Sequence, residues 1–138
     1  MSGEHDHTVA TPTVASEEKP YGVRIDAGGH ALRGDEPVDH GGADTGPPPF
    51  GLFLSGLGAC TAITLRMYAE RKKWPLAGVD VKLTYIVQDK RTRWIERLIT
   101  VHGVDDDQRA KLAEIAEKTP VTKAVRAGTE IRTNTEAA

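Results

Sequence analysis

Residues 41–61 read GGADTGPPPFGLFLSGLGACT and carry the pattern that decides the fold. Glycines and prolines open the stretch as a loop, and the apolar residues after them predict a long helix from about residue 48 to residue 73. Trp74-Pro75 ends this helix, because the residue before a proline disfavours helical geometry. The only cysteine, Cys60, lies inside the helix. A single thiol cannot form a disulfide within one subunit, so Cys60 is either a small core residue or a reactive group.

Alternating apolar and polar residues on both sides of this helix predict antiparallel strands. Gly28-Gly29 supplies the turn of a first hairpin, and Asp105-x-x-Gln108 resembles a capping box that opens a second helix. The order strand–strand–helix–strand–strand–helix–strand is typical of an α+β protein, with helices packed on antiparallel sheets. The elements around the long helix are expected at residues 21–33, 79–87, 94–102, 105–118 and 130–133.

The composition excludes several classes of protein. The chain has 18 basic and 20 acidic residues and a net charge of −2, so it lacks the excess of positive charge that binds nucleic acid or an anionic membrane. The longest apolar stretch, Phe50–Leu65, is shorter than the roughly 20 residues that span a bilayer. The N-terminus lacks the apolar region of a signal peptide, and one cysteine suits a reducing compartment. We therefore expect a soluble, cytoplasmic protein with no nucleic-acid and no membrane partner.

The first 19 residues are polar and without periodicity. They predict a disordered N-terminal tail over residues 1–19, followed by one domain over residues 20–138. His5 and His7 lie in this tail without a third ligand, and two such histidines seldom hold a metal. We expect neither a metal nor an organic cofactor.

Small residues gather on one stripe of the long helix when it is drawn at 100° per residue. Glycine inside a helix costs roughly 1 kcal/mol relative to alanine, so this stripe needs a packing reason. Either other elements of the same domain or the same helix of a second copy can pack there. The stripe consists of Gly51, Ser55, Gly58, Ala59 and Ala62.

Cys60 lies on the opposite side of the helix, beside apolar residues. Free cysteine is among the most buried residue types, which favours an inert core thiol. Cys60 also lies about three turns into the helix, beyond the useful reach of the helix dipole. A reactive Cys60 therefore needs a cationic or hydrogen-bonding partner from another segment or subunit, and Arg33 and His40 are the candidates. The neighbours of Cys60 on the helix are Phe53, Gly56, Leu57, Thr64 and Met67.

The loop and helix resemble the OsmC/Ohr family, in particular its OsmC-like branch. The resemblance rests on Gly42-x-Asp44-x-Gly46-Pro47-x-Pro49-Phe50 and on Leu57-Gly58-Ala59-Cys60-Thr61. It continues through Trp74-Pro75-Leu76 to Thr119-Pro120-Val121 and covers roughly Val23 to Thr133. It implies an OsmC-like fold in which two intertwined subunits form an obligate homodimer, with the central helices buried and the active sites at the subunit interface.

The resemblance also implies a chemistry, because many members reduce organic hydroperoxides. Cys60 matches the cysteine that attacks the O–O bond and becomes a sulfenic acid. In the family a second cysteine then forms a disulfide, which an external dithiol reduces, and an arginine and a glutamate usually activate the first thiolate. An apolar wall would suit fatty or aromatic hydroperoxides. In this chain the wall would be formed by Phe50, Phe53, Leu57, Thr64 and Met67.

The chain departs from the family pattern at three positions. Thr119 stands where the second cysteine is expected, and Phe50-Gly51 stands where the glutamate is expected. His40 aligns with the usual arginine, and Arg33 is the other candidate for the positive charge.

Two hypotheses follow from these departures. The first is a one-cysteine, peroxiredoxin-like oxidoreductase in which Cys60 reduces a small hydrophobic hydroperoxide in oxidative stress defence. Its sulfenic acid would be reduced by an external thiol, and His40 or Arg33 would stabilise the thiolate. The second is a non-catalytic dimer that binds a small hydrophobic ligand at the subunit interface.

Overall fold

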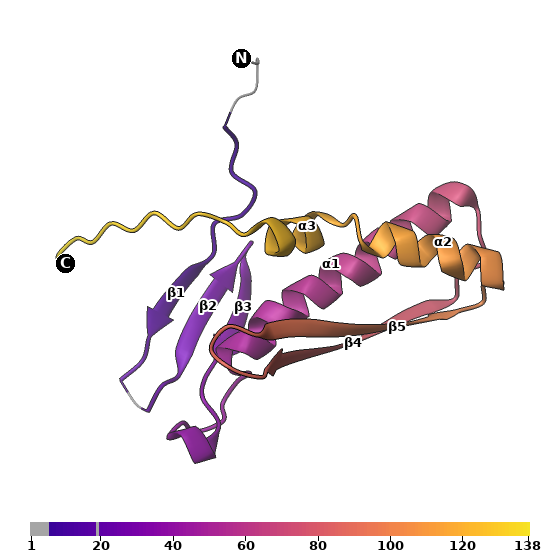
Figure 1. Ribbon diagram of the computed structural model, residues 1–138. Coiled ribbons are helices and arrows are strands. Elements are labelled where there is room, and N and C mark those ends of the chain that lie inside the picture. Colours follow the sequence, from indigo (N-terminus) through magenta and orange to yellow (C-terminus); the bar gives the residue numbers. More distant parts are fainter. Residues whose placement is uncertain (1–5, 19) are drawn as a thin grey trace. The chain divides into compact units, whose positions relative to one another are not determined.

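The computed structural model describes residues 6–18 and 20–138. The chain divides into two compact units, residues 1–53 and residues 54–138, and the long helix α1 (Pro49–Lys72) runs across the boundary. The helix confirms the expectation of a helix over about residues 48–73, and helices with antiparallel sheets confirm the α+β class. The two units are described in turn (Figure 1).

The first unit contains a three-stranded antiparallel sheet in the order β1-β2-β3. Strands β2 (Val23–Ala27) and β3 (His30–Gly34) form the predicted hairpin. Gly28 and Gly29 turn between them with φ of 60° and 81°, values that glycine adopts without steric cost. Strand β1 (Thr13–Ser16) was not expected, because these residues fall in the predicted tail. They pair with β2 from Thr13↔Asp26 to Ser16↔Val23, so the sheet rather than a disordered tail accommodates them.

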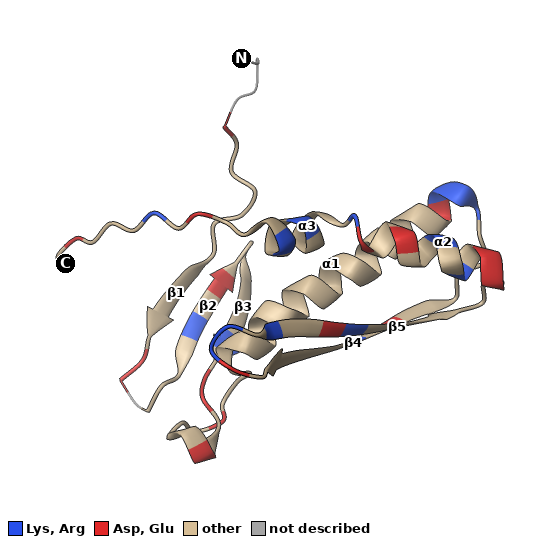
Figure 2. Ribbon diagram, in the orientation of Figure 1, with Lys and Arg blue, Asp and Glu red and all other residues tan. Residues whose placement is uncertain are grey.

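The second unit contains the predicted second hairpin, β4 (Gly78–Val87) with β5 (Arg93–His102). Helix α2 (Asp106–Ala116) begins at the predicted capping box: the Asp105 carboxylate accepts from the Gln108 backbone N–H, and the Gln108 side chain accepts from the Asp105 backbone N–H. Basic residues end α1 and acidic residues begin α2, as the helix dipoles favour (Figure 2).

The core of the second unit lies where the C-terminal half of α1 and helix α2 cover one face of the β4–β5 hairpin. Along both strands, inward residues are half-buried in alternation with exposed ones, as the period-2 pattern predicts. Half-buried Val79, Ile99 and Val101 pack against the buried core. The buried core residues are Leu65, Ala69, Leu76, Leu112 and Ala116.

The C-terminal end differs from the sequence-based expectation. No strand forms around residues 130–133, and the described residues 128–138 have no regular secondary structure. Instead a third helix, α3 (Pro120–Ala127), begins directly after Thr119, whose hydroxyl accepts from the Thr122 backbone N–H. Threonine at the N-cap followed by proline at the first helical position is a helix-start signal, and this signal identifies α3 in the sequence.

Helix α1 is long and apolar enough to cross a membrane by length and composition alone, because it extends beyond the apolar stretch Phe50–Leu65. One face of its C-terminal half nevertheless packs against the core, where Leu65 is fully buried and Ala69 is 1% exposed. Such packing is that of a core helix rather than of a membrane span.

Candidate thiol site

Cys60 lies on the flank of the buried face of α1. The next residue, Thr61, is fully buried, whereas Cys60 is half-buried. Successive helical residues are about 100° apart, so one residue faces the core while its neighbour lies at the edge of the covered face. The buried residues of α1 are Leu57, Gly58, Thr61, Leu65 and Ala69.

Gly58 brings this turn of α1 close to strand β4. A Cβ at residue 58 would lie only 2.8 Å from Leu83 Cδ1, so the absence of a side chain permits the contact. Gly56 has nothing within 4 Å of its Cβ position. The stripe of small residues could pack against the same domain or against a second copy. For Gly58, the contact with Leu83 of the same subunit is the reason.

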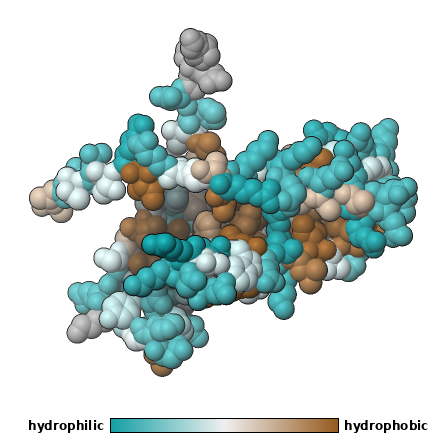
Figure 3. Space-filling model, viewed as in Figure 1, coloured by the Kyte–Doolittle hydropathy of each residue, from teal (hydrophilic) through white to brown (hydrophobic). Residues whose placement is uncertain are grey.

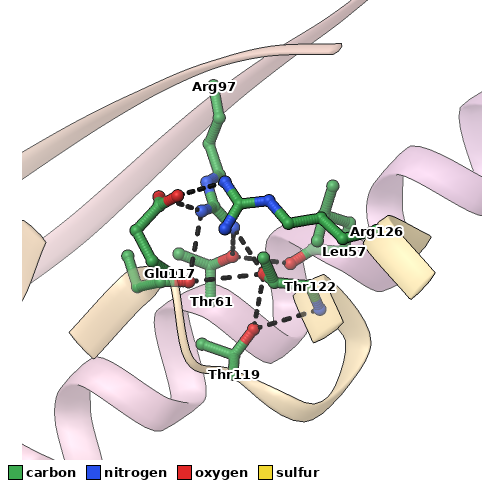
Figure 4. Close-up of polar contacts among 8 residues, drawn as sticks. Leu57, Thr61, Arg97, Glu117, Thr119, Thr122 and Arg126 are labelled. Atoms are coloured by element: carbon green, nitrogen blue, oxygen red, sulfur yellow. Dashed lines mark hydrogen bonds and ion pairs between the residues drawn. The ribbon is translucent and has the colours of Figure 1, made fainter. Parts of the chain in front are cut away.

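A cluster of polar side chains, here called the Arg97 cluster, joins Thr61 of α1 to residues of other elements (Figure 4). It comprises the side chains of Thr61, Arg97, Glu117, Thr119, Thr122 and Arg126, together with the Ala116 carbonyl.

Arg97 is the centre of this cluster. Its Nη1 donates to Thr61 Oγ1 at 3.0 Å and to Thr122 Oγ1 at 2.8 Å. Its Nη2 donates to the Ala116 carbonyl at 3.1 Å and to Glu117 Oε2 at 3.0 Å. The Arg97 side chain is only 11% exposed, so these partners replace the water that the guanidinium loses on burial.

The threonine hydroxyls of the cluster are satisfied as well. Thr61 Oγ1 donates to the Leu57 carbonyl at 2.8 Å, and Thr119 Oγ1 donates to Thr122 Oγ1 at 2.7 Å. Among the residues that the structure describes, no buried side-chain nitrogen or oxygen lacks a hydrogen-bond partner. A fully satisfied polar network of this kind specifies one arrangement of the elements that it joins.

Glu117 carries the only negative charge of the cluster. Arg126 and Arg97 both donate to its carboxylate. The hydrogen bond from Arg126 is the main reason that the pKa of Glu117 is lowered, and the charge of Arg126 and the contacts of Arg97 lower it further, whereas burial opposes the shift.

The Cys60 thiol has a different environment. It makes no hydrogen bond with any residue in the described ranges 6–18 and 20–138, and it is a free cysteine. Along the same side of α1, Ile63 and Met67 are each 58% exposed and Thr64 is half-buried. We call Cys60, Ile63, Thr64 and Met67 the Cys60 flank.

The two basic candidates, Arg33 and His40, belong to the first unit. Arg33 Nη2 lies 2.5 Å from Glu17 Oε1 and 3.3 Å from Thr45 Oγ1. The hydrogen bond between the two side chains raises the pKa of Arg33 and lowers that of Glu17. His40 is exposed at the end of a short 3₁₀ helix (Val38–His40).

Asp35 holds the loop that follows Arg33. It is 3% exposed, and Thr45 donates to its Oδ2 through both the hydroxyl, at 2.6 Å, and the backbone N–H, at 3.1 Å. These hydrogen bonds, the hydroxyl first, lower the pKa of Asp35. Thr45 is thus bound to Asp35 and Arg33 together, which orders the segment leading to α1.

The predicted apolar wall is distributed over both units. Phe50 and Phe53, which are 57% and 42% exposed, meet edge to face with ring centroids 6.3 Å apart. Leu57 is 4% exposed, and Thr64 and Met67 belong to the Cys60 flank. In the described part of the chain, no three His, Cys, Asp or Glu side chains gather as metal ligands.

Sequence reasoning missed Glu17 as the partner of Arg33 and Arg97 as the centre of the polar cluster beside Cys60. For Arg97 a signal was present: residues 95, 97, 99 and 101 form the inward register of β5, and Arg97 is the only charged residue among them. A charge at an inward position predicts a buried partner. Glu17 carried no such signal, because it lies in the segment that was expected to be disordered.

Comparisons with known proteins identify the architecture. The profile of a protein family described as "OsmC-like protein" matches residues 41–134, more than half of the chain. No curated protein sequence matches the chain.

Solved structures of similar fold include two bacterial proteins whose names mention stress or resistance. A putative osmotic stress induced and detoxification response protein from Psychrobacter arcticus is 19% identical, with a TM-score of 0.69 over 89% of this chain and 91% of that one. The organic hydroperoxide resistance protein OhrB of Bacillus subtilis is 19% identical, with a TM-score of 0.62 over 86% and 91% of the two chains.

A third example is an organic hydroperoxide resistance protein OsmC from Legionella pneumophila, which is 16% identical. Its TM-score is 0.64, and the match covers 88% of this chain and 92% of that chain. At these identities the structural likeness establishes the fold.

Proposed function

The chain belongs to the OsmC-like protein family, and from this premise we propose that it reduces organic hydroperoxides with Cys60 as its only reacting thiol. A general role in oxidative stress is supported by the family and by neighbours named for organic hydroperoxide resistance. The observation that carries the proposal is the state of Cys60: it is a free, half-buried thiol, and it lies inside the segment that the family profile matches.

The proposed reaction has two steps. The Cys60 thiolate attacks one peroxide oxygen, the O–O bond breaks, and the alkoxide that leaves takes up a proton to give an alcohol. Cys60 is thereby oxidised to a sulfenic acid. Two equivalents of an external thiol then reduce it, which releases water and the disulfide of that thiol. No second cysteine of the chain takes part, because Cys60 is the only one.

Arg33 or His40 is the proposed source of positive charge for the thiolate. The pairing of Arg33 with Glu17 supports Arg33, because it supplies an arginine–carboxylate pair although Phe50-Gly51 replaces the glutamate expected in the loop. A carboxylate that fixes an arginine can orient its guanidinium toward a reacting group.

We further propose that the protein acts in the cytoplasm as a homodimer. Apolar side chains remain at the surface (Figure 3). On α1, Ile63 and Met67 are each 58% exposed. A second copy that covers α1 would remove them from water. Light scattering of the purified protein should give twice the subunit mass, and Met67→Glu should reduce that mass to one subunit.

The proposed reaction is tested by mixing reduced protein with one equivalent of cumene hydroperoxide. Intact mass should rise by one oxygen in the wild type, and Cys60→Ser should show neither this gain nor peroxide consumption. Ala59→Ser is the matched control, because it places a hydroxyl on the neighbouring, exposed residue and retains the thiol. Peroxide consumption by the Cys60→Ser variant, or a wild-type rate no higher than that of free cysteine, would contradict the proposal.

The second candidate function is binding of a small hydrophobic ligand at the dimer interface without catalysis. The structure of Thr119 favours it, because this residue caps α3 with a buried hydroxyl at the position where the family pattern has a thiol. In that case Cys60→Ser would bind an apolar fluorescent probe as tightly as the wild type does, and the wild type would fail the peroxide test.

A further inference from the structure

Arg97 connects strand β5 to three helices through a single guanidinium group. The Nη1 atom binds Thr61 on α1 and Thr122 on α3, and Nη2 binds the last turn of α2 at the Ala116 carbonyl. Figure 4 shows these groups converging on Arg97 from separate elements. The Arg97 side chain is 11% exposed and donates hydrogen bonds from both Nη atoms, so it has little freedom to move.

This arrangement fixes the turn of α1 that carries Cys60. Thr61 follows Cys60 directly, and its hydroxyl is held between Arg97, at 3.0 Å, and the Leu57 carbonyl, at 2.8 Å. Gly58, in the same turn, lies against Leu83, and Leu83 is the residue directly opposite Arg97 in the β4–β5 ladder. Rotation of the turn would therefore break the hydrogen bond to Arg97 and the contact with Leu83 together.

The Cys60 side chain has no polar contact of its own that could fix its direction. Among the described residues its thiol has no hydrogen-bond partner, so its Cα–Cβ direction follows from the backbone of the turn. A thiolate attacks a peroxide or a disulfide along the axis of the bond that breaks. A small displacement of the attacking sulfur can therefore lower the rate by a large factor.

We propose that Arg97 is a positioning residue for Cys60 and acts through the hydroxyl of Thr61. The inference rests on the proposed function in that Cys60 is the reacting thiol. It adds that the direction of attack is set by a strand residue that makes no hydrogen bond to the thiol.

The test compares two buried threonines that accept hydrogen bonds from the same nitrogen of Arg97. Thr61→Val removes the acceptor next to Cys60, and Thr122→Val removes the acceptor on α3, with a similar change of shape. We expect Thr61→Val to slow oxidation of Cys60 by cumene hydroperoxide about tenfold, and Thr122→Val to change it less than about twofold. Thr61→Ser, which restores a hydroxyl, should recover most of the rate. Circular dichroism verifies that all variants are folded at the assay temperature.

A double-mutant cycle separates the action through Thr61 from a general loss of structure. Arg97→Lys alone should slow oxidation, and in the Thr61→Val background it should produce no further change. Equal slowing by Thr61→Val and Thr122→Val, no slowing by either, or additive effects in the cycle would overturn the proposal.

An aromatic disulfide, 5,5′-dithiobis(2-nitrobenzoate), makes the result independent of peroxide chemistry, because thiolate attack on it is also in line. If the wild type fails to reduce hydroperoxide, the proposed function falls. The positioning role then stands if Thr61→Val alone slows reaction with the disulfide, and it falls if both threonine variants react at the same rate.

Discussion

The Arg97 cluster and the Cys60 flank lie on two sides of the same turns of α1 and differ in almost every physical respect. The cluster is charged, its threonines are buried, and each of its hydroxyls has a partner. The flank is apolar and half open, and its thiol has no hydrogen-bond partner in the described part of the chain. Thr61 and Cys60 are adjacent in sequence, yet Thr61 belongs to the Arg97 cluster and Cys60 to the flank.

The difference indicates a division of roles along one helix. Hydrogen bonds on the inner side fix the position of the turn, so the outer side needs no polar contacts to be well placed. The thiol on the outer side is left open to a partner from another segment or a second copy, whereas the buried Thr61 has two hydrogen-bond partners and serves structure. If this division is correct, substitutions on the inner side should affect stability and, at Thr61 and Arg97, also the placement of the thiol. Substitutions on the outer side should affect reactivity with little loss of stability.

Arg97→Met should produce the largest loss of stability. It removes four hydrogen bonds and leaves the Glu117 carboxylate with Arg126 alone. We expect the free energy of unfolding to fall by about 2 kcal/mol, less than the ~3–5 kcal/mol of a fully buried ion pair because Glu117 is half-exposed. Urea unfolding measures this loss, and an unchanged midpoint would contradict the structural role of the cluster.

Thr119→Ala should have a smaller effect. The Thr119 hydroxyl caps α3 by accepting from the Thr122 backbone N–H and also donates to the Thr122 hydroxyl. Loss of an N-cap typically costs about 1 kcal/mol. Thermal unfolding of Thr119→Ala and of Thr119→Ser distinguishes the hydroxyl from the methyl group, because only the alanine variant should be destabilised.

Acid should weaken the cluster through Glu117. The pKa of this carboxyl is lower in the folded protein than its ordinary value of 4.5, so its ion pairs stabilise the fold above about pH 4.5. This contribution is lost as the pH falls through the folded-state value. Glu117→Gln should therefore be less stable than the wild type at pH 7, and the difference should narrow below pH 4. A constant difference from pH 7 to pH 3 would show that the ionised carboxylate contributes nothing.

Cys60→Ser should have the smallest effect on stability. The thiol has no hydrogen bond to lose, and its half-buried position leaves room for hydration of a hydroxyl. We expect a change within about 0.5 kcal/mol, as for a surface substitution. The same urea experiment provides the comparison with Arg97→Met, and a loss of similar size in both variants would erase the distinction between the two sides of α1.

Local patterns predicted the elements that depend on local physics. The apolar run with its proline-rich start gave α1, period-2 alternation gave both hairpins, and the capping box at Asp105 gave α2. Helix α3 was not predicted although Thr119-Pro120 carries a start signal, because its eight residues are too few to establish a helical periodicity. Strand β1 depends on pairing with β2, and its own residues show no strong alternation.

The candidate site was less predictable because its contacts join distant residues. Arg97 and Thr61 are 36 positions apart, and Arg33 and Glu17 are 16 apart. Helical periodicity placed Cys60 on an apolar flank, but no local rule specifies which strand residue faces the neighbouring threonine. The inward register of Arg97 was the one sequence feature that indicated a buried charge.

The presence of one cysteine, half-buried on a long helix, also makes the protein suitable for site-specific spectroscopy without any substitution. A nitroxide attached to Cys60 would give each subunit a single spin label at a defined helical position. If two copies associate, a dipolar spectrum would contain one distance distribution, and its width would report how uniformly the two helices are placed.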